Sequence, residues 1–328
     1  MKIFYTFLLL LFTIQAWCQP NSNFNDTLIQ VHDPVITRQD STYYIFCTGQ
    51  GITAYSSTDM KHWKREQPVF SQAPDWAVKT IPGFKGHVWA PDISFHNGQY
   101  YLYYSVSAFG KNTSCIGVAT NITLDPAAGN FKWIDHGKVI ESVPGRDMWN
   151  AIDPNLAMDE NNEPWLAFGS FWDGIKLVKM DKSLTSVAQP EKWFTIASRK
   201  RTGSIPDSVA GDAAIEGPFI YKHDKYFYLF TSFDYCCRGE KSTYKMMVGR
   251  SEHIQGPYVD KNDLPLNDGG GSLVLEGDKN WHGVGHNAVA AFNGIDYLIF
   301  HAYDANDRGR PKLRIEKITW VNDWPVIQ

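Results

Sequence analysis

Five related segments follow one another along the chain, and this repeat restricts the possible folds more than any other feature of the sequence. Each segment opens with a polar residue and a short apolar or small stretch. The five openings are Asp33–Ile36, Asp92–Phe95, Asp153–Leu156, Glu216–Phe219 and His286–Val289. Their first residues stand 59 to 70 positions apart, which is the length of one multi-stranded unit.

Further strand patterns recur inside each segment. Polar turns such as Asn97-Gly98 and Asn293-Gly294 lead into an aromatic strand, and a third strand follows. A tryptophan or a Pro-Tyr pair then marks an outer strand, and several of these runs alternate polar and apolar residues. Four strands in each of five units predict an all-β chain that folds as a single five-bladed β-propeller over residues 19–328.

The opening residues are the first candidates for a functional site. In a propeller the first strand of each blade lines the central channel, so the five openings would surround one mouth of it. They are Asp33, Asp92, Asp153, Glu216 and His286. Aspartate is common at turns, and one such residue would be an ordinary strand start. Four carboxylates and a histidine at matched positions favour a site instead.

The N-terminus has the pattern of a secretory signal peptide over residues 1–18. Lys2 precedes an apolar run from Ile3 to Ile14, and Ala16-Trp17-Cys18 resembles a cleavage site. The alternative is a lipidated Cys18, which the bulky Trp17 beside it disfavours. No later segment approaches the 18 apolar residues of a membrane span, so we expect a secreted or periplasmic protein.

Charge and aromatic content narrow the function classes. The net charge is −4, and the one basic block is Arg199–Arg201, which argues against a nucleic-acid partner and predicts a solvated loop. Aromatic residues make up 14% of the chain, and tyrosine and tryptophan both suit strands and stack on sugars. Cys47 and Cys115 lie in apolar strands as small buried residues. Cys236-Cys237 permits either a vicinal disulfide or a loop-packing role.

A ring of carboxylates can support acid–base chemistry. Crowding and burial raise the pKa of at least one carboxyl, and one raised and one ordinary carboxyl make a general acid and a general base. Glycoside hydrolysis requires such a pair. Glu216, in the apolar run Ala213–Phe219, is the better acid. Asp33 and Asp153 both begin an Asp-Pro pair, and one is expected to be the base while the other holds the acid.

The motifs around these residues resemble those of glycoside hydrolase family 43, most closely its endo-acting arabinanases. The resemblance covers essentially the whole mature chain, and its specificity comes from the order and spacing of the motifs. They are Val31–Pro34, Ser57–Trp63, Trp89–Asp92, Asn150–Pro154, Ile215–Pro218 and Gly285–Asn287.

The resemblance implies a single-displacement, inverting mechanism and assigns the roles that the residues alone leave open. Asp33 matches the family's general base, Glu216 its general acid, and Asp153 the residue that orients the acid and tunes its pKa. His286 matches a histidine beside a central ion, usually calcium, that is coordinated largely by water. Asp92 has no catalytic counterpart, and we interpret it as a structural or metal-side carboxylate.

A second layer of candidates would bind substrate around the channel mouth. Five aromatic residues near first strands or in loops after second strands could stack on sugars, and Asn150 could bind a sugar hydroxyl. The aromatic residues are Trp89, Phe109, Trp149, Phe171 and Trp172. Each could instead pack between blades.

Together these features predict a secreted monomer that hydrolyses α-1,5-linked arabinan or arabino-oligosaccharides internally. One alternative is an exo-acting β-xylosidase or α-L-arabinofuranosidase of the same family. The other is a non-catalytic sugar-binding propeller, which the complete set of Asp33, Asp153 and Glu216 disfavours.

Overall fold

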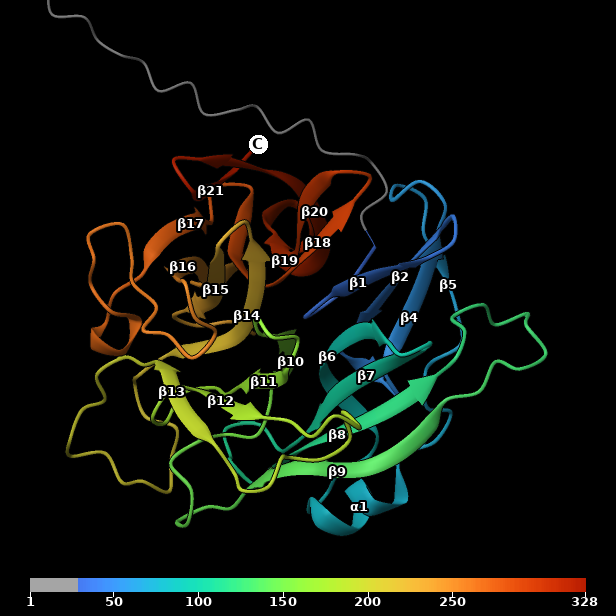
Figure 1. Ribbon diagram of the computed structural model, residues 1–328, viewed down its shortest axis with the longest axis horizontal. Helices are drawn as coiled ribbons and strands as arrows, with labels where there is room; N and C mark the ends of the chain where they lie inside the picture. The colour runs from blue at the N-terminus through green and yellow to red at the C-terminus, as the bar shows by residue number, and fades with distance from the viewer. Residues whose placement is uncertain (1–28) are drawn as a thin grey trace, which may run out of the picture.

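The chain folds into five antiparallel sheets arranged as blades around a centre (Figure 1). The computed structural model describes residues 29–328, so the predicted signal peptide lies outside the described residues. The expected five-bladed β-propeller is confirmed. Within residues 29–328, no helix has the length and apolar character needed to cross a bilayer.

Each blade runs from an inner strand to an outer one in chain order, with one strand added to the second blade. Blade 1 contains β1 (Val35–Gln39), β2 (Thr42–Cys47), β4 (Thr53–Ser57) and β5 (Lys64–Arg65). Blade 2 contains β3 (Gly49–Gln50), β6 (His87–His96), β7 (Gln99–Val106), β8 (Ser114–Asn121) and β9 (Ile134–Ser142). Blade 3 contains β10 (Asn155–Met158), β11 (Pro164–Phe168), β12 (Ile175–Lys179) and β13 (Trp193–Ala197).

The last two blades follow the same plan. Blade 4 contains β14 (Ile215–His223), β15 (Tyr226–Phe233), β16 (Lys245–Ser251) and β17 (Ser272–Glu276). Blade 5 contains β18 (Trp281–Phe292), β19 (Ile295–Asp304), β20 (Arg310–Val321) and β21 (Trp324–Ile327). The described helices are short: α1 (Asp75–Thr80), η1 (Gly239–Lys241), η2 (Leu266–Asp268) and η3 (Ala305–Asp307).

Backbone bonds join the first and last blades. The amide of Leu313 in β20 donates to the carbonyl of Ile29 at 3.0 Å, and Gln30 forms a bridge with Lys312. The apolar cores lie where neighbouring blades face each other. One core combines residues of β1, β2 and β7 with Ala288 of β18, so packing as well as hydrogen bonding closes the ring.

One backbone feature defines equivalent positions in the five blades. A residue with positive φ stands at or just before each inner strand, and a proline follows it in four blades. These residues are Asp33 (51°), Ala90 (44°), Asp153 (60°), Gly217 (59°) and His286 (48°). We call them the ring residues. In each blade, the residue two positions after the ring residue pairs with the second strand, and this pairing is equivalent in all five blades.

The ring residues correct the predicted alignment at two positions. Asp92 lies two residues beyond its ring residue, and Glu216 lies one residue before Gly217. The alignment of the five repeats by sequence placed acidic side chains at equivalent positions. In the fold, the equivalent positions are instead the residues with a left-handed backbone conformation that lead into the inner strands. Glu216 therefore reaches the channel mouth from a different backbone position than Asp33 and Asp153.

Asp92 has the structural role among the predicted alternatives. It is buried and accepts the amide of Leu156 at 2.8 Å and the side-chain amide of Asn155 at 3.3 Å. Asn155 in turn accepts the amide of Ile220 at 2.8 Å, so the two side chains connect the inner strands of blades 2, 3 and 4. Burial raises the pKa of Asp92 to about 6 despite the donated hydrogen bonds.

Candidate active site

A cleft of 1120 Å³ opens at the channel mouth and is lined by residues of all five blades. The structure brings Asp33, Asp153, Glu216 and His286 together in its lining. Asp92 is not among the lining residues. The three carboxylates that the sequence singles out for catalysis therefore share one site, although they lie far apart in the chain.

The Asp33 carboxylate is surrounded by hydrogen-bond donors and histidines. Its Oδ2 accepts Thr48 Oγ1 at 2.5 Å, and its Oδ1 lies 2.8 Å from His32 Nδ1 and 3.2 Å from His286 Nδ1. Burial acts to raise the pKa of Asp33, but the charges of His32 and His286 and the hydrogen bond from His32 outweigh it and lower the pKa. Asp33 is therefore ionised at neutral pH and able to accept a proton from water.

Glu216 keeps its proton to a much higher pH than Asp33 does. Ser170 Oγ donates to its Oε2 at 2.5 Å, and the Tyr244 hydroxyl donates to its Oε1. Burial raises the pKa of Glu216 to about 7; the bond from Ser170 opposes this shift, and the charge of Asp33 adds to it. A carboxyl with this pKa can hold a proton at neutral pH and deliver it to a leaving group.

Asp153 is the third buried carboxyl of the site, and its pKa is raised, as is that of Glu216. Its Oδ2 accepts the backbone amide of Gly217 at 3.1 Å, and its own amide donates to Ser105 Oγ at 3.0 Å. Burial and the negative charges of Glu216 and Asp33 raise the pKa of Asp153. Because Asp153 and Glu216 repel each other when both are ionised, the pair favours keeping a proton on one of them.

A repeated hydrogen bond positions the ring residues. In four blades the ring amide donates to a side chain from the second-strand end of the preceding blade. The pairs are Asp33 with His301, Ala90 with Thr48, Asp153 with Ser105, and His286 with Ser232. In blade 4 the corresponding Ser170 donates to the Glu216 side chain instead, and the Gly217 amide bonds Asp153. The exception lies at the expected general acid.

His286, the predicted metal ligand, lies beside Asp33 at the centre of this group. Burial lowers the pKa of His286 despite the Asp33 charge, and a neutral imidazole is the form that binds cations. The next residue, Asn287, is 2% exposed, and both its amide atoms lack a partner within residues 29–328. A buried amide oxygen is a ligand type that suits calcium, and the expected ion beside His286 stays a prediction.

Five of the six predicted substrate-binding residues line the cleft. Phe109 is 80% exposed, whereas Trp172 is only 1% exposed and its indole donates to the Asp207 carbonyl at 2.8 Å. Asn150 accepts Ser114 Oγ at 2.6 Å. Trp89 and Phe171 complete the five. Their sugar contacts stay predictions, and the burial of Trp172 leaves little of its ring for stacking.

Trp149 is the predicted substrate-binding residue that does not line the cleft. Its ring stacks on Trp193 at 5.4 Å between centroids, and its indole nitrogen donates to the Glu141 carbonyl at 3.3 Å. The alternative of packing between elements therefore describes Trp149, because one ring face is covered by Trp193 and the ring does not line the cleft.

The basic run also differs from its prediction. Arg199 donates to the Ala214 carbonyl and to Asp234, both at 2.8 Å, and Arg201 donates to backbone carbonyls of Ile205, Pro206 and Val209. Both guanidinium groups therefore hydrogen-bond within the segment 199–214 or to Asp234, beside a second, smaller cavity, and are not simply solvated.

Several site residues were missed from the sequence. His32 lies inside the Val31–Pro34 motif, but the motif by itself indicates a role only for its neighbour Asp33. Thr48, Ser170 and Tyr244 lie at strand ends or in loops with no local motif. Cys236 and Cys237 form a vicinal disulfide and line the cleft, which decides between the two predicted alternatives. Cys47 and Cys115 are free and buried, as expected.

Comparison with known proteins agrees with this site. The model of Glycosyl hydrolases family 43 matches residues 28–325. An extracellular exo-α-(1→5)-L-arabinofuranosidase of Cellvibrio japonicus is 50% identical over 91% of this chain and 86% of its own. An extracellular endo-α-(1→5)-L-arabinanase of Bacillus subtilis is 40% identical over 90% of this chain and 87% of its own.

A solved structure supports the same grouping. The Cellvibrio cellulosa α-L-arabinanase complexed with arabinohexaose superposes with a TM-score of 0.90 at 50% identity, covering 92% of this chain and 96% of that one. The fold, the three carboxylates in one cleft and the family match over nearly all described residues agree, and the chain belongs to glycosyl hydrolases family 43.

Proposed function

We propose that the protein is a secreted hydrolase of α-1,5-linked L-arabinan that acts with inversion of configuration. The observation that carries the proposal is that one cleft holds Asp33, whose pKa is lowered, and Glu216, whose pKa is raised to about 7. The substrate class is supported by relatives named for α-(1→5)-L-arabinan bonds and by the related structure that binds arabinohexaose.

In the proposed reaction Asp33 takes a proton from a water molecule as the water oxygen bonds to the anomeric carbon. Glu216 gives its proton to the glycosidic oxygen as the bond between that oxygen and the anomeric carbon breaks. Asp153 accepts the Gly217 amide next to the acid, and repulsion between the Asp153 and Glu216 charges favours keeping a proton on one of the two. One displacement on one face inverts the anomeric configuration.

Two observations bear on the mode of attack. Internal cleavage is supported by aromatic side chains from three blades in the cleft lining: Phe109, Phe171 and Tyr235. Such residues would allow a chain to cross the carboxylates with sugars bound on either side. Attack from a chain end is the second candidate, because the 50% identical relative is named an exo enzyme while the endo-named relative is 40% identical.

A time course on linear arabinan separates the two modes. Internal cleavage predicts a fast fall in viscosity and mixed oligosaccharides among the first products. Attack from the end predicts one small product from the start, with viscosity lagging behind the release of reducing ends. Proton NMR of the first product tests inversion, and an initial product with retained configuration contradicts the single-displacement mechanism.

A calcium ion beside His286 is part of the proposal. His286 and the unpartnered amide of Asn287 would hold it together with water, near the negative charge of Asp33. When bound, such an ion would supply positive charge that stabilises the crowded carboxylates.

Secretion is proposed from the N-terminal pattern over residues 1–18 and from the two relatives named extracellular. Expression of the full chain, followed by N-terminal sequencing of the exported protein, tests it. The expected first residue is Gln19, and an unprocessed Met1 in the exported fraction contradicts cleavage after Cys18.

A further inference from the structure

The hydroxyl of Tyr303 connects the vicinal disulfide to the histidine beside the expected base. Tyr303 lies in β19 and is 3% exposed. Its hydroxyl oxygen lies 2.8 Å from the backbone nitrogen of Cys237 and 2.8 Å from Nε2 of His32. The other ring nitrogen of His32, Nδ1, lies 2.8 Å from Oδ1 of Asp33. Four groups therefore form one continuous hydrogen-bonded chain.

The donor and the acceptor of each hydrogen bond in this series can be assigned by counting protons. The Cys237 amide can only donate, so the Tyr303 oxygen accepts from it and its own proton is available for Nε2 of neutral His32. An imidazole that accepts at Nε2 carries its proton at Nδ1, which then donates to Asp33. In the protonated imidazole both nitrogens donate and Nδ1 still faces Asp33. In either state an N–H is directed at the carboxylate, and in the neutral ring it is the Tyr303 hydroxyl that favours this form.

The same histidine is also held through its ring face. His301 stacks on His32 with centroids 3.9 Å apart and an interplanar angle of 25°. Nδ1 of His301 accepts the backbone amide of Asp33 at 3.2 Å. Thr48 donates to the second carboxylate oxygen of Asp33. With His32 on one oxygen and Thr48 on the other, the plane of the carboxylate is fixed.

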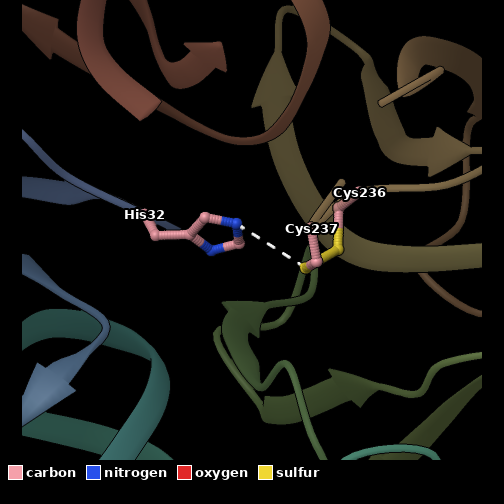
Figure 2. Close-up of side chains that lie close together, drawn as sticks. All are labelled: His32, Cys236 and Cys237. Carbon is pink, nitrogen blue, oxygen red and sulfur yellow. Dashed lines mark hydrogen bonds between the residues drawn. A yellow bond between two sulfur atoms is a disulfide. The ribbon is translucent and has the colours of Figure 1, made fainter. Parts of the chain in front are cut away.

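The hydrogen-bonded series that starts at Asp33 ends at the Cys236–Cys237 disulfide, in the loop between β15 and η1 (Figure 2). A bond between consecutive cysteines closes a small covalent ring that includes the amide linking them, which restricts how that amide can turn. Cys237 has a φ of 67°, and its Sγ lies 3.8 Å from Nε2 of His32. The amide that donates to Tyr303 is therefore held covalently, and the sulfur packs against His32.

We propose that Tyr303 and the Cys236–Cys237 disulfide are positioning residues for the general base, acting on Asp33 through His32. The inference rests on the proposed function, in which Asp33 activates water. A base has to hold its oxygen toward the attacking water, and a displacement of about 1 Å can cost about 10²-fold in rate. Losing the disulfide or the tyrosine hydroxyl frees His32 to turn away from Asp33.

The first test removes the hydroxyl alone. Tyr303→Phe is expected to lower kcat on linear arabinan by ~10–100-fold with little change in KM, because the base is misplaced while the sugar contacts stay. Tyr228→Phe is the matched control: this buried tyrosine donates to the Asp323 carbonyl at 2.7 Å and does not line the cleft. It should keep its kcat. An unchanged kcat in Tyr303→Phe, or a loss confined to KM, overturns the assignment.

The second test opens the disulfide in the wild-type protein. Dithiothreitol converts it to two thiols while being oxidised itself, and alkylation followed by mass measurement verifies the reduction. We expect kcat to fall by ~10-fold and to recover on reoxidation. The double variant Cys236→Ser/Cys237→Ser should show the same loss and no response to dithiothreitol. Full activity of the verified reduced enzyme overturns the role of the disulfide.

A third measurement does not depend on any substrate. The ¹⁵N shifts of the His32 ring in labelled wild-type protein report which nitrogen carries a proton, and His32→Gln identifies the signals. Nδ1 should be protonated at neutral pH and remain so after addition of arabinan. An unprotonated Nδ1 overturns the inference even in an active enzyme. A protonated Nδ1 in a protein that fails to cleave arabinan supports the chain of bonds and overturns only the proposed function.

Discussion

Ser170 Oγ donates a 2.5 Å hydrogen bond to Oε2 of Glu216, whereas the corresponding side chain in each other blade accepts a ring amide. The fold thus uses one repeated position for two purposes. In four blades it fixes the backbone at the channel mouth, and in blade 4 it binds the expected acid. Because Ser170 does not accept the Gly217 amide, that amide donates to Asp153 instead. The backbone next to Glu216 is thereby hydrogen-bonded to a second carboxylate of the site.

Glu216→Gln should lower kcat on arabinan by ~10²–10⁴-fold, the usual scale for loss of a general acid. Aryl arabinosides with good leaving groups should lose much less, because their leaving oxygen needs little protonation. Parallel kinetics on both substrates check this. Equal losses on the two substrates would contradict the assignment of Glu216 as the acid.

Asp33→Asn should be poor on every substrate, because water needs a base whatever the leaving group. The amide keeps the size of the carboxyl and an acceptor for Thr48, so oligosaccharide binding should persist. Calorimetry with arabino-oligosaccharide, together with a melting curve that shows an intact fold, checks the prediction. Lost binding in a folded variant would move Asp33 to a binding role.

The repeat made the fold predictable from sequence, because hairpin turns and aromatic strands recur in each unit. The sequence also indicated the three carboxylates that share the cleft, since Asp33 and Asp153 precede prolines at ring positions and Glu216 precedes the ring residue Gly217. The predicted alignment of the repeats was wrong at Asp92 and Glu216. The left-handed conformation at the ring positions is adopted by Ala90 and Gly217 as well as by aspartate, so the side chain does not mark the position.

The rest of the site depends on contacts that no local pattern encodes. Ser170 and Tyr244 reach Glu216 from two blades, and a serine or tyrosine at a strand end is common in any β protein. Trp149 is a case in which position in the chain suited a sugar platform, but its ring stacks on Trp193 and does not line the cleft. Which ring face stays free is decided by neighbours distant in sequence.

Chelation tests the proposed ion. Excess EDTA should lower the melting temperature, and added calcium should restore it, because an ion that binds only the folded state stabilises it by mass action. Asn287→Ala should weaken the calcium response and leave the Asp33 contacts of His32 and Thr48 in place. An unchanged melting curve in chelator, with no metal by elemental analysis, would leave His286 as a channel residue without an ion.

Ser170→Ala should shift the alkaline limb of kcat/KM to higher pH. The hydroxyl donates to Glu216 and stabilises the carboxylate, so it lowers a pKa that burial raises to about 7. Without that bond the pKa of Glu216 rises further, and the protonated acid persists to higher pH. Ser198→Ala is the control, since Ser198 donates to the Asn267 carbonyl outside the cleft and should leave the limb in place. An alkaline limb that stays fixed or moves to lower pH in Ser170→Ala would show that this limb does not report the ionisation of Glu216.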